Sequence, residues 1–224
     1  MRALLRYQAG VLFRSHRWVF PLVVFVLLIS VAGVGNKQPL ATGLDWSAAV
    51  LVPVVALLTR SMLTAEPDEA RACVAAATGP VRAHLSVLIA ALAGAIVLAV
   101  VGVGYEIFTS GNVAHLWSGH PGQLVTTVGA GLGKALICIF VGSAVAALCN
   151  RPVIRHQTVA LLATVAAVVI GLLSSVSPAN AALRGNGAAI QAPAWPAGVP
   201  LLAAAALLGA AWLVSAWLAA RRSG

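Results

Sequence analysis

One lysine, Lys134, lies inside a long apolar run, in the stretch GAGLGKA over residues 129–135. This stretch resembles a phosphate-binding loop, in which backbone amides and a lysine hold the phosphates of a nucleotide. It departs from that pattern twice, because Val128 replaces the first glycine and Ala135 replaces the serine or threonine that binds Mg²⁺. We therefore expect no nucleotide to bind to this chain.

Lys134 remains a candidate functional residue for another reason. A cation deep in a bilayer costs about 2.5–3.5 kcal/mol on insertion scales and is usually paired or faces a cavity. We expect Lys134 either to line the path of a substrate or to have a structural role where two helices meet. Glu106, near the outer edge of another apolar run, is the one carboxylate that we expect beside the membrane interior.

The glycines around Lys134 predict close helix packing. Gly129 and Gly133 form a small-xxx-small pair, and Gly131 and Gly142 thin the same helix further.

No group of residues predicts catalysis or a metal site. His115, His120 and Glu106 are the one outer group with metal-binding or acid–base potential, and a five-residue spacing in a glycine-rich loop is weak support for a metal. The serine-hydrolase motif GxSxG and the zinc motif HExxH do not occur. We expect this chain to have no catalytic residue and no bound metal, and not to be an enzyme.

The composition predicts an integral membrane protein. Hydrophobic residues make up 61% of the chain, charged residues 8%, and the mean hydropathy is +0.98. Long apolar runs must cross a bilayer as helices, because helices satisfy their own backbone hydrogen bonds. The predicted fold is therefore all-α, with one membrane domain over residues 18–224. Its six predicted spans cover residues 18–35, 46–63, 84–104, 123–149, 157–176 and 198–220.

Residues 1–17 precede the first span and predict an amphipathic helix in the membrane interface. Its apolar face is expected to hold Leu4, Leu5, Tyr7, Val11 and Leu12, and its basic face Arg2, Arg6 and Arg17.

The arginines and lysines predict the orientation. Eleven lie before span one, between spans two and three, between spans four and five, or after span six, whereas Lys37 and Arg184 alone lie on the other side. The positive-inside rule then places both termini in the cytoplasm. The net charge of +9 is thus explained by topology, and no nucleic-acid partner is expected.

The segment from Arg60 to Leu85 is the polar island of this chain. Pro67 suits a helix start, the acidic residues around it favour the positive end of the helix dipole, and Gly79-Pro80 ends the helix. We predict a helix over Asp68 to Thr78. It would either lie on lipid headgroups as a capped loop or bind a protein partner, and its acidic residues suit a protein better than an anionic leaflet.

The order of these elements resembles the permease subunits of ABC transporters of the exporter type. The phrases TAEPDEARACVAAATGPVRAHL, LCNRPVIRHQ and SPANAALR are similar to small actinobacterial permeases of that class. The resemblance implies an N-terminal elbow helix, and a coupling helix between spans two and three that binds a separate ATPase. The implied partner-binding residues are Glu66, Asp68, Glu69, Arg71, Val74 and Thr78.

The resemblance also implies a function. The chain would be one permease of a dimer in the cell membrane, paired with a second copy or a related permease. ATP and Mg²⁺ would bind to the partner ATPase and not to this chain. The cargo would be a hydrophobic or amphipathic small molecule, a peptide or a lipid, moved outward. The alternative is a passive channel or a structural membrane scaffold that needs no motor.

Overall fold

The computed structural model describes residues 2–33, 38–150, 156–184 and 198–222, and every element within them is a helix. The helices are α1 (Arg2–Ser15), α2 (Val19–Gly33), α3 (Leu40–Leu63), α4 (Asp68–Thr78), α5 (Pro80–Thr109), α6 (Val113–Gly119), α7 (Pro121–Cys149), α8 (Gln157–Leu173), α9 (Pro178–Arg184) and α10 (Gly198–Arg222). Over these ranges the predicted all-α fold is confirmed.

Four of the described helices, α3, α5, α7 and α10, are long and apolar enough to cross a bilayer. α8 and α9 are bent by 41° at the break between them and, taken as one element, would make a fifth span. α2 is apolar but has only 15 residues. The described chain is therefore a multi-pass membrane protein with four or five candidate spans, and the predicted six stays a prediction.

α3 and α7 form the centre of the bundle, and α3 also packs against α2 and α5. Val52 and Val55 on α3 are buried in the same apolar cluster as Cys138 and Ile139 on α7. The two helices approach closely at Gly142, where an added Cβ would lie 2.6 Å from the backbone oxygen of Val52. This contact requires glycine, because a methyl group there would collide with the main chain.

The glycines of α7 do not all serve that contact. Gly131 and Gly142 lie against α3, whereas Gly129 and Gly133 have no described atom within 4 Å of an added Cβ. The predicted close packing is therefore made by the first pair. The second pair has no packing partner among the described parts of this chain.

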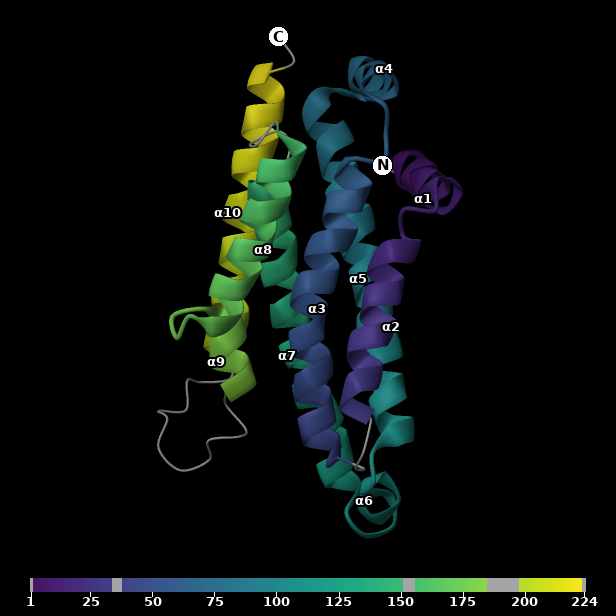
Figure 1. Ribbon diagram of the computed structural model, residues 1–224, viewed down its shortest axis with the longest axis vertical. Coiled ribbons are helices and arrows are strands. Elements are labelled where there is room, and N and C mark those ends of the chain that lie inside the picture. Colours follow the sequence, from purple (N-terminus) through teal and green to yellow (C-terminus); the bar gives the residue numbers. More distant parts are fainter. Residues whose placement is uncertain (1, 34–37, 151–155, 185–197, 223–224) are drawn as a thin grey trace.

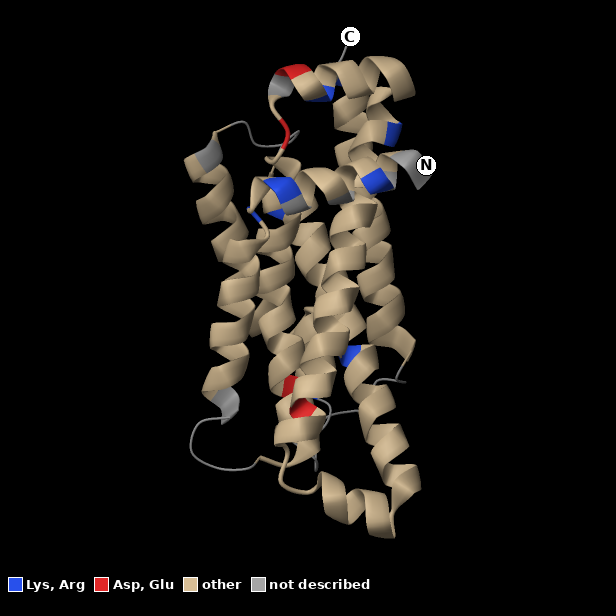
Figure 2. Ribbon diagram, turned by 90° about the vertical axis from the view of Figure 1, so that its right-hand side faces the viewer, with Lys and Arg blue, Asp and Glu red and all other residues tan. Residues whose placement is uncertain are grey.

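Figure 1 shows α1, α4 and the end of α10 at one end of the bundle, and α6 at the opposite end. In Figure 2 the Lys and Arg positions gather at the end that carries α1 and α4, while a few charged positions lie inside the bundle nearer the other end. Most of the described basic residues thus lie at one end of the bundle, while the predicted orientation in the membrane stays a prediction. Lys37, Arg151 and Arg155, which entered that count, lie outside the described residues.

The end that carries α6 is more helical than the sequence predicted. α3 begins at Leu40, so Asp45 lies inside this helix and not in the preceding loop. A residue distant in sequence caps the N-terminus of α3: the Asn112 side-chain oxygen accepts a hydrogen bond from the Leu40 amide at 2.9 Å. α6 and α9 form where loops were expected, and Ala179 and Ala182 of α9 are buried against the bundle.

Candidate functional site

The predicted cytoplasmic helix is present as α4, with the predicted bounds. Pro67 stands at its N-cap, and the chain reverses after it at Gly79, whose φ of 86° is a left-handed value that glycine adopts without strain. Pro80 then begins α5. Two proline positions and one glycine therefore fix a helix of 11 residues between two long apolar helices.

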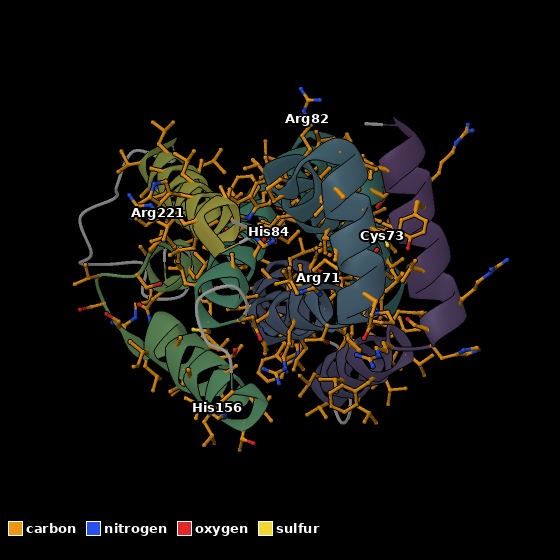
Figure 3. All side chains as sticks on the ribbon, turned by 90° about the horizontal axis from the view of Figure 1, so that it is seen from above. Arg71, Cys73, Arg82, His84, His156 and Arg221 are labelled. Carbon is orange, nitrogen blue, oxygen red and sulfur yellow. The ribbon has the colours of Figure 1, made fainter. Side chains whose placement is uncertain are left out.

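One face of α4 is turned toward the bundle. Arg71, Val74, Ala75 and Thr78 follow helical spacing on this half-buried face. The Arg71 guanidinium donates a hydrogen bond to the backbone oxygen of Leu63 at the end of α3. Figure 3 shows Arg71 directed from α4 over the bundle. A cation at the C-terminus of α3 also favours its helix dipole, so Arg71 fastens α4 to α3.

Glu66 has a comparable internal contact. It is only 7% exposed, and one of its oxygens accepts a hydrogen bond from the Gln8 side-chain amide at 3.0 Å. Although Tyr7 is 42% exposed, partial loss of water around its hydroxyl raises its pKa, and the charge of Glu66 and a hydrogen bond to it raise the pKa further. Glu66 therefore joins α1 to the linker between α3 and α4.

Arg17 adds a third tie at the same place. Its guanidinium donates to the backbone oxygen of Thr64 at 2.5 Å and to the Thr64 hydroxyl at 3.3 Å. The end of α3 thus receives arginines from both α4 and the α1–α2 junction. This arrangement makes α1, α3 and α4 one connected unit.

The opposite face of α4 is open. Glu69, Ala72, Cys73 and Ala76 are all exposed and recur at helical spacing; we call these four residues the outer stripe. Figure 3, which views the molecule from this end, shows Cys73 on the edge of α4 nearer to α1. Ala72, Cys73 and Ala76 have small side chains, so another protein could approach the backbone of α4 closely along this stripe.

The structure thus divides the six predicted partner-binding residues. Glu69 lies on the exposed face. Glu66 and Arg71 make contacts within the chain, and Val74 and Thr78 lie on the half-buried face, where the Thr78 hydroxyl donates to the Val74 backbone oxygen at 2.8 Å. The side chain of Asp68 lies outside the described residues. Whether any of the six binds a partner stays a prediction.

Lys134 lies in α7, 8% exposed, and its Nζ is 2.5 Å from Oδ1 of Asp45 on α3. The side chains of the lysine and aspartate are 10% and 23% exposed. A partly buried ion pair between the two central helices favours the structural alternative for Lys134, because the charge is satisfied within the chain. For Lys134 to face a cargo, α3 and α7 would have to move apart.

Glu106 lies in α5, 5% exposed, with its carboxyl group against Gly43 of α3. A Cβ at Gly43 would be 2.1 Å from Oε2, so the absence of a side chain there makes room for the carboxyl group. Oε1 is buried and has no hydrogen-bond partner among the described residues. Glu106 and Lys134 therefore contact the same helix, α3, from α5 and α7.

The outer histidines lie side by side at the end of the bundle that carries α6. The rings of His115 and His120 stack with centroids 6.3 Å apart, and both residues are exposed. Among the described residues, no group of three or more His, Cys, Asp or Glu side chains has a metal-binding arrangement.

Sequence reasoning missed three of these contacts. Gln8, on the face of α1 expected to be apolar, is 2% exposed and binds Glu66. Gly43 and Asp45 lie just before residue 46, where the second span was predicted to begin. A helical continuation of α3 back to Leu40 would have placed Asp45 within the membrane and suggested a pairing with Lys134.

Comparison of this chain with protein-family models, with curated proteins and with solved structures gave no match. Its function has to be inferred from the residues and their geometry.

Proposed function

We propose that this chain is the membrane-spanning permease subunit of an ATP-driven transporter of the ABC exporter type, and that the outer stripe of α4 docks a separate ATPase subunit. One observation carries the proposal. α4 lies beyond the end of the bundle with its outer stripe exposed, while its other face is fastened to α3 through Arg71. A helix that only filled a loop would need no such attachment.

The attachments suggest how force would pass into the membrane. ATP binding can shift a membrane domain between two states only if the docked partner makes different contacts in each. Arg71 of α4 binds at the end of α3, so a displacement of α4 would move α3. α3 carries Asp45 and Gly43, and these contact Lys134 and Glu106 respectively. The central helix would therefore connect the docking surface to the buried charges.

The remaining features follow from the same proposal. α2 and the α8–α9 pair would complete six spans, and α1 would lie in the membrane interface as an elbow. The end that carries α1 and α4 would lie on the cytoplasmic side of the cell membrane, because the basic residues gather there. The permease would work as a dimer with itself or a related permease. Its cargo would be a hydrophobic or amphipathic small molecule, a peptide or a lipid, moved outward.

The test is the recovery of an ATPase with the tagged chain from membranes of its native host. A soluble subunit that hydrolyses ATP should copurify with the wild-type chain. Ala76→Trp would place a large ring in the outer stripe, and Glu69→Lys would reverse its charge, so each should release the ATPase. The matched control is Ala114→Trp, which adds the same ring to an exposed alanine of α6 at the opposite end.

Retention of the ATPase by both α4 variants would contradict the docking surface. Absence of any ATPase from the wild-type preparation would contradict the transporter class. In that case, ATP-independent solute flux through liposomes that contain the purified chain would favour the passive channel, and no flux would favour the scaffold.

A further inference from the structure

The carboxyl group of Glu106 is buried, and no opposite charge pairs with it among the described residues. Its Oε1 is fully enclosed and accepts no hydrogen bond from a described residue. The ammonium group of Lys134 is paired with the carboxylate of Asp45, 2.5 Å away. A carboxylate in such surroundings would lose its hydration with nothing to replace it, and this strongly favours the neutral, protonated form.

The side of Glu106 that faces α3 has no room for a larger ligand while the two helices are packed together. Oε2 lies so close to the backbone of Gly43 that even a methyl group there would overlap it, at 2.1 Å. Neither a hydrated metal ion nor an organic ammonium group fits between the carboxyl group and α3. A proton is the cation that adds almost no volume.

The position of Glu106 would allow that proton to exchange. α5 ends at Thr109, less than one turn beyond Glu106, and the exposed Gly111 follows soon after. At 1.5 Å per residue, the Cα of Glu106 is about 5 Å along the helix axis from the end of α5. A small separation of α3 from α5 would therefore bring water to Glu106 without opening the whole bundle.

We propose that Glu106 is a proton-binding site within the membrane domain: its carboxyl group holds a proton while α3 packs against α5, and it releases the proton to water when the two helices separate. The O–H bond breaks on release, the electron pair stays on the carboxylate, and a water molecule accepts the proton. The ionisable groups on the helices around this end of α5 are Asp45 on α3, Lys134 on α7 and His115 on α6, with His120 just after α6.

α3 is the element that would link the two charged sites. Gly43 and Asp45 lie two residues apart, which places them on opposite sides of a helix with 3.6 residues per turn. Gly43 accordingly contacts Glu106 of α5, while Asp45 contacts Lys134 of α7. Any movement of α3 would change both contacts together. The proton site does not depend on the ATPase proposal, since it concerns only this chain.

The experiment is labelling of the purified chain in lipid nanodiscs with dicyclohexylcarbodiimide. This apolar reagent takes the proton of a carboxylic acid and then forms a bond to the carboxylate, and the product rearranges to a stable N-acylurea. Peptide mass spectrometry should find the label on Glu106. Its extent should fall several-fold as the pH is raised, because the carboxyl group loses its proton.

The matched control is Glu69, the same side chain exposed on α4. A water-soluble carbodiimide should label Glu69, and the apolar reagent should label it weakly at neutral pH. Glu106→Gln should abolish the label at that position. Gly43→Ala should push the carboxyl group away from α3 toward water, and so move the midpoint of labelling to lower pH.

Two results would overturn the proposal. Glu106 that stays unlabelled at every pH would mean that no separation of α3 from α5 presents a protonated carboxyl group, against the proposal. Labelling that does not change with pH would mean a permanently neutral structural group. The pH dependence in the wild-type chain decides between these outcomes even where Gly43→Ala does not yield folded protein. All of these measurements omit the ATPase, so their failure would leave the docking test standing.

Discussion

The ion pair between Lys134 and Asp45 offers the sharpest quantitative test of the bundle. Lys134→Met removes the cation while keeping much of the side-chain volume, and leaves Asp45 without its partner. Breaking a buried pair in this way typically costs about 3–5 kcal/mol. The side chain of Asp45 is 23% exposed and keeps some contact with its surroundings, so we expect the lower end of that range, about 3 kcal/mol.

Removing both charges should cost much less. The double variant Asp45→Asn/Lys134→Met has no unpaired charge at this site. Its free energy of unfolding should lie within about 1 kcal/mol of the wild-type value. The coupling energy of the double-mutant cycle should therefore be about 2 kcal/mol or more. Arg82→Met is the matched control, because Arg82 is exposed and Figure 3 shows it directed away from the bundle. Its effect should stay within about 0.5 kcal/mol.

The assay is unfolding by SDS titration in mixed micelles, followed by the fluorescence of the six tryptophans. Additive losses in the double variant would refute the pairing as an energetic contact. So would a Lys134→Met variant as stable as the Arg82→Met control.

Two further predictions concern packing and topology. Gly142→Ala should lower the free energy of unfolding by about 1–3 kcal/mol, because the added Cβ would lie 2.6 Å from the Val52 oxygen. Gly133→Ala, in open space on the same helix, should raise the free energy of unfolding by up to about 1 kcal/mol. Equal effects of the two variants in the SDS titration would contradict the close contact at Gly142. In a variant that keeps Cys73 as its one cysteine, this exposed residue of α4 should react with a membrane-impermeant maleimide only after the cells are permeabilised. Ser118→Cys on α6, with Cys73 also replaced, should react in intact cells, and the reverse pattern would invert the proposed topology.

Local sequence signals were sufficient for much of the fold. Apolar runs that exceed the bilayer thickness can hardly be anything but helices, so the membrane class and the all-α fold followed directly. The bounds of α4 were also predictable, because Pro67 and Gly79-Pro80 act on the backbone of their immediate neighbours. The same signals failed at α6 and α9, whose short helices pack against the bundle, α6 through the partly buried Val113 and Leu116 and α9 through the buried Ala179 and Ala182.

The candidate sites depended on tertiary structure. Lys134 and Asp45 are separated by 89 positions, and Gln8 and Glu66 by 58. Which side chains meet across such distances is decided by how each helix is rotated about its axis and where it begins, and neither is encoded in a local pattern. The sequence by itself therefore determined that this chain crosses a membrane and carries a short polar helix. The packing of α1 against the α3–α4 linker decided that Glu66 is internal. The packing of α3 between α5 and α7 decided that Lys134 is paired and that Glu106 is enclosed against Gly43.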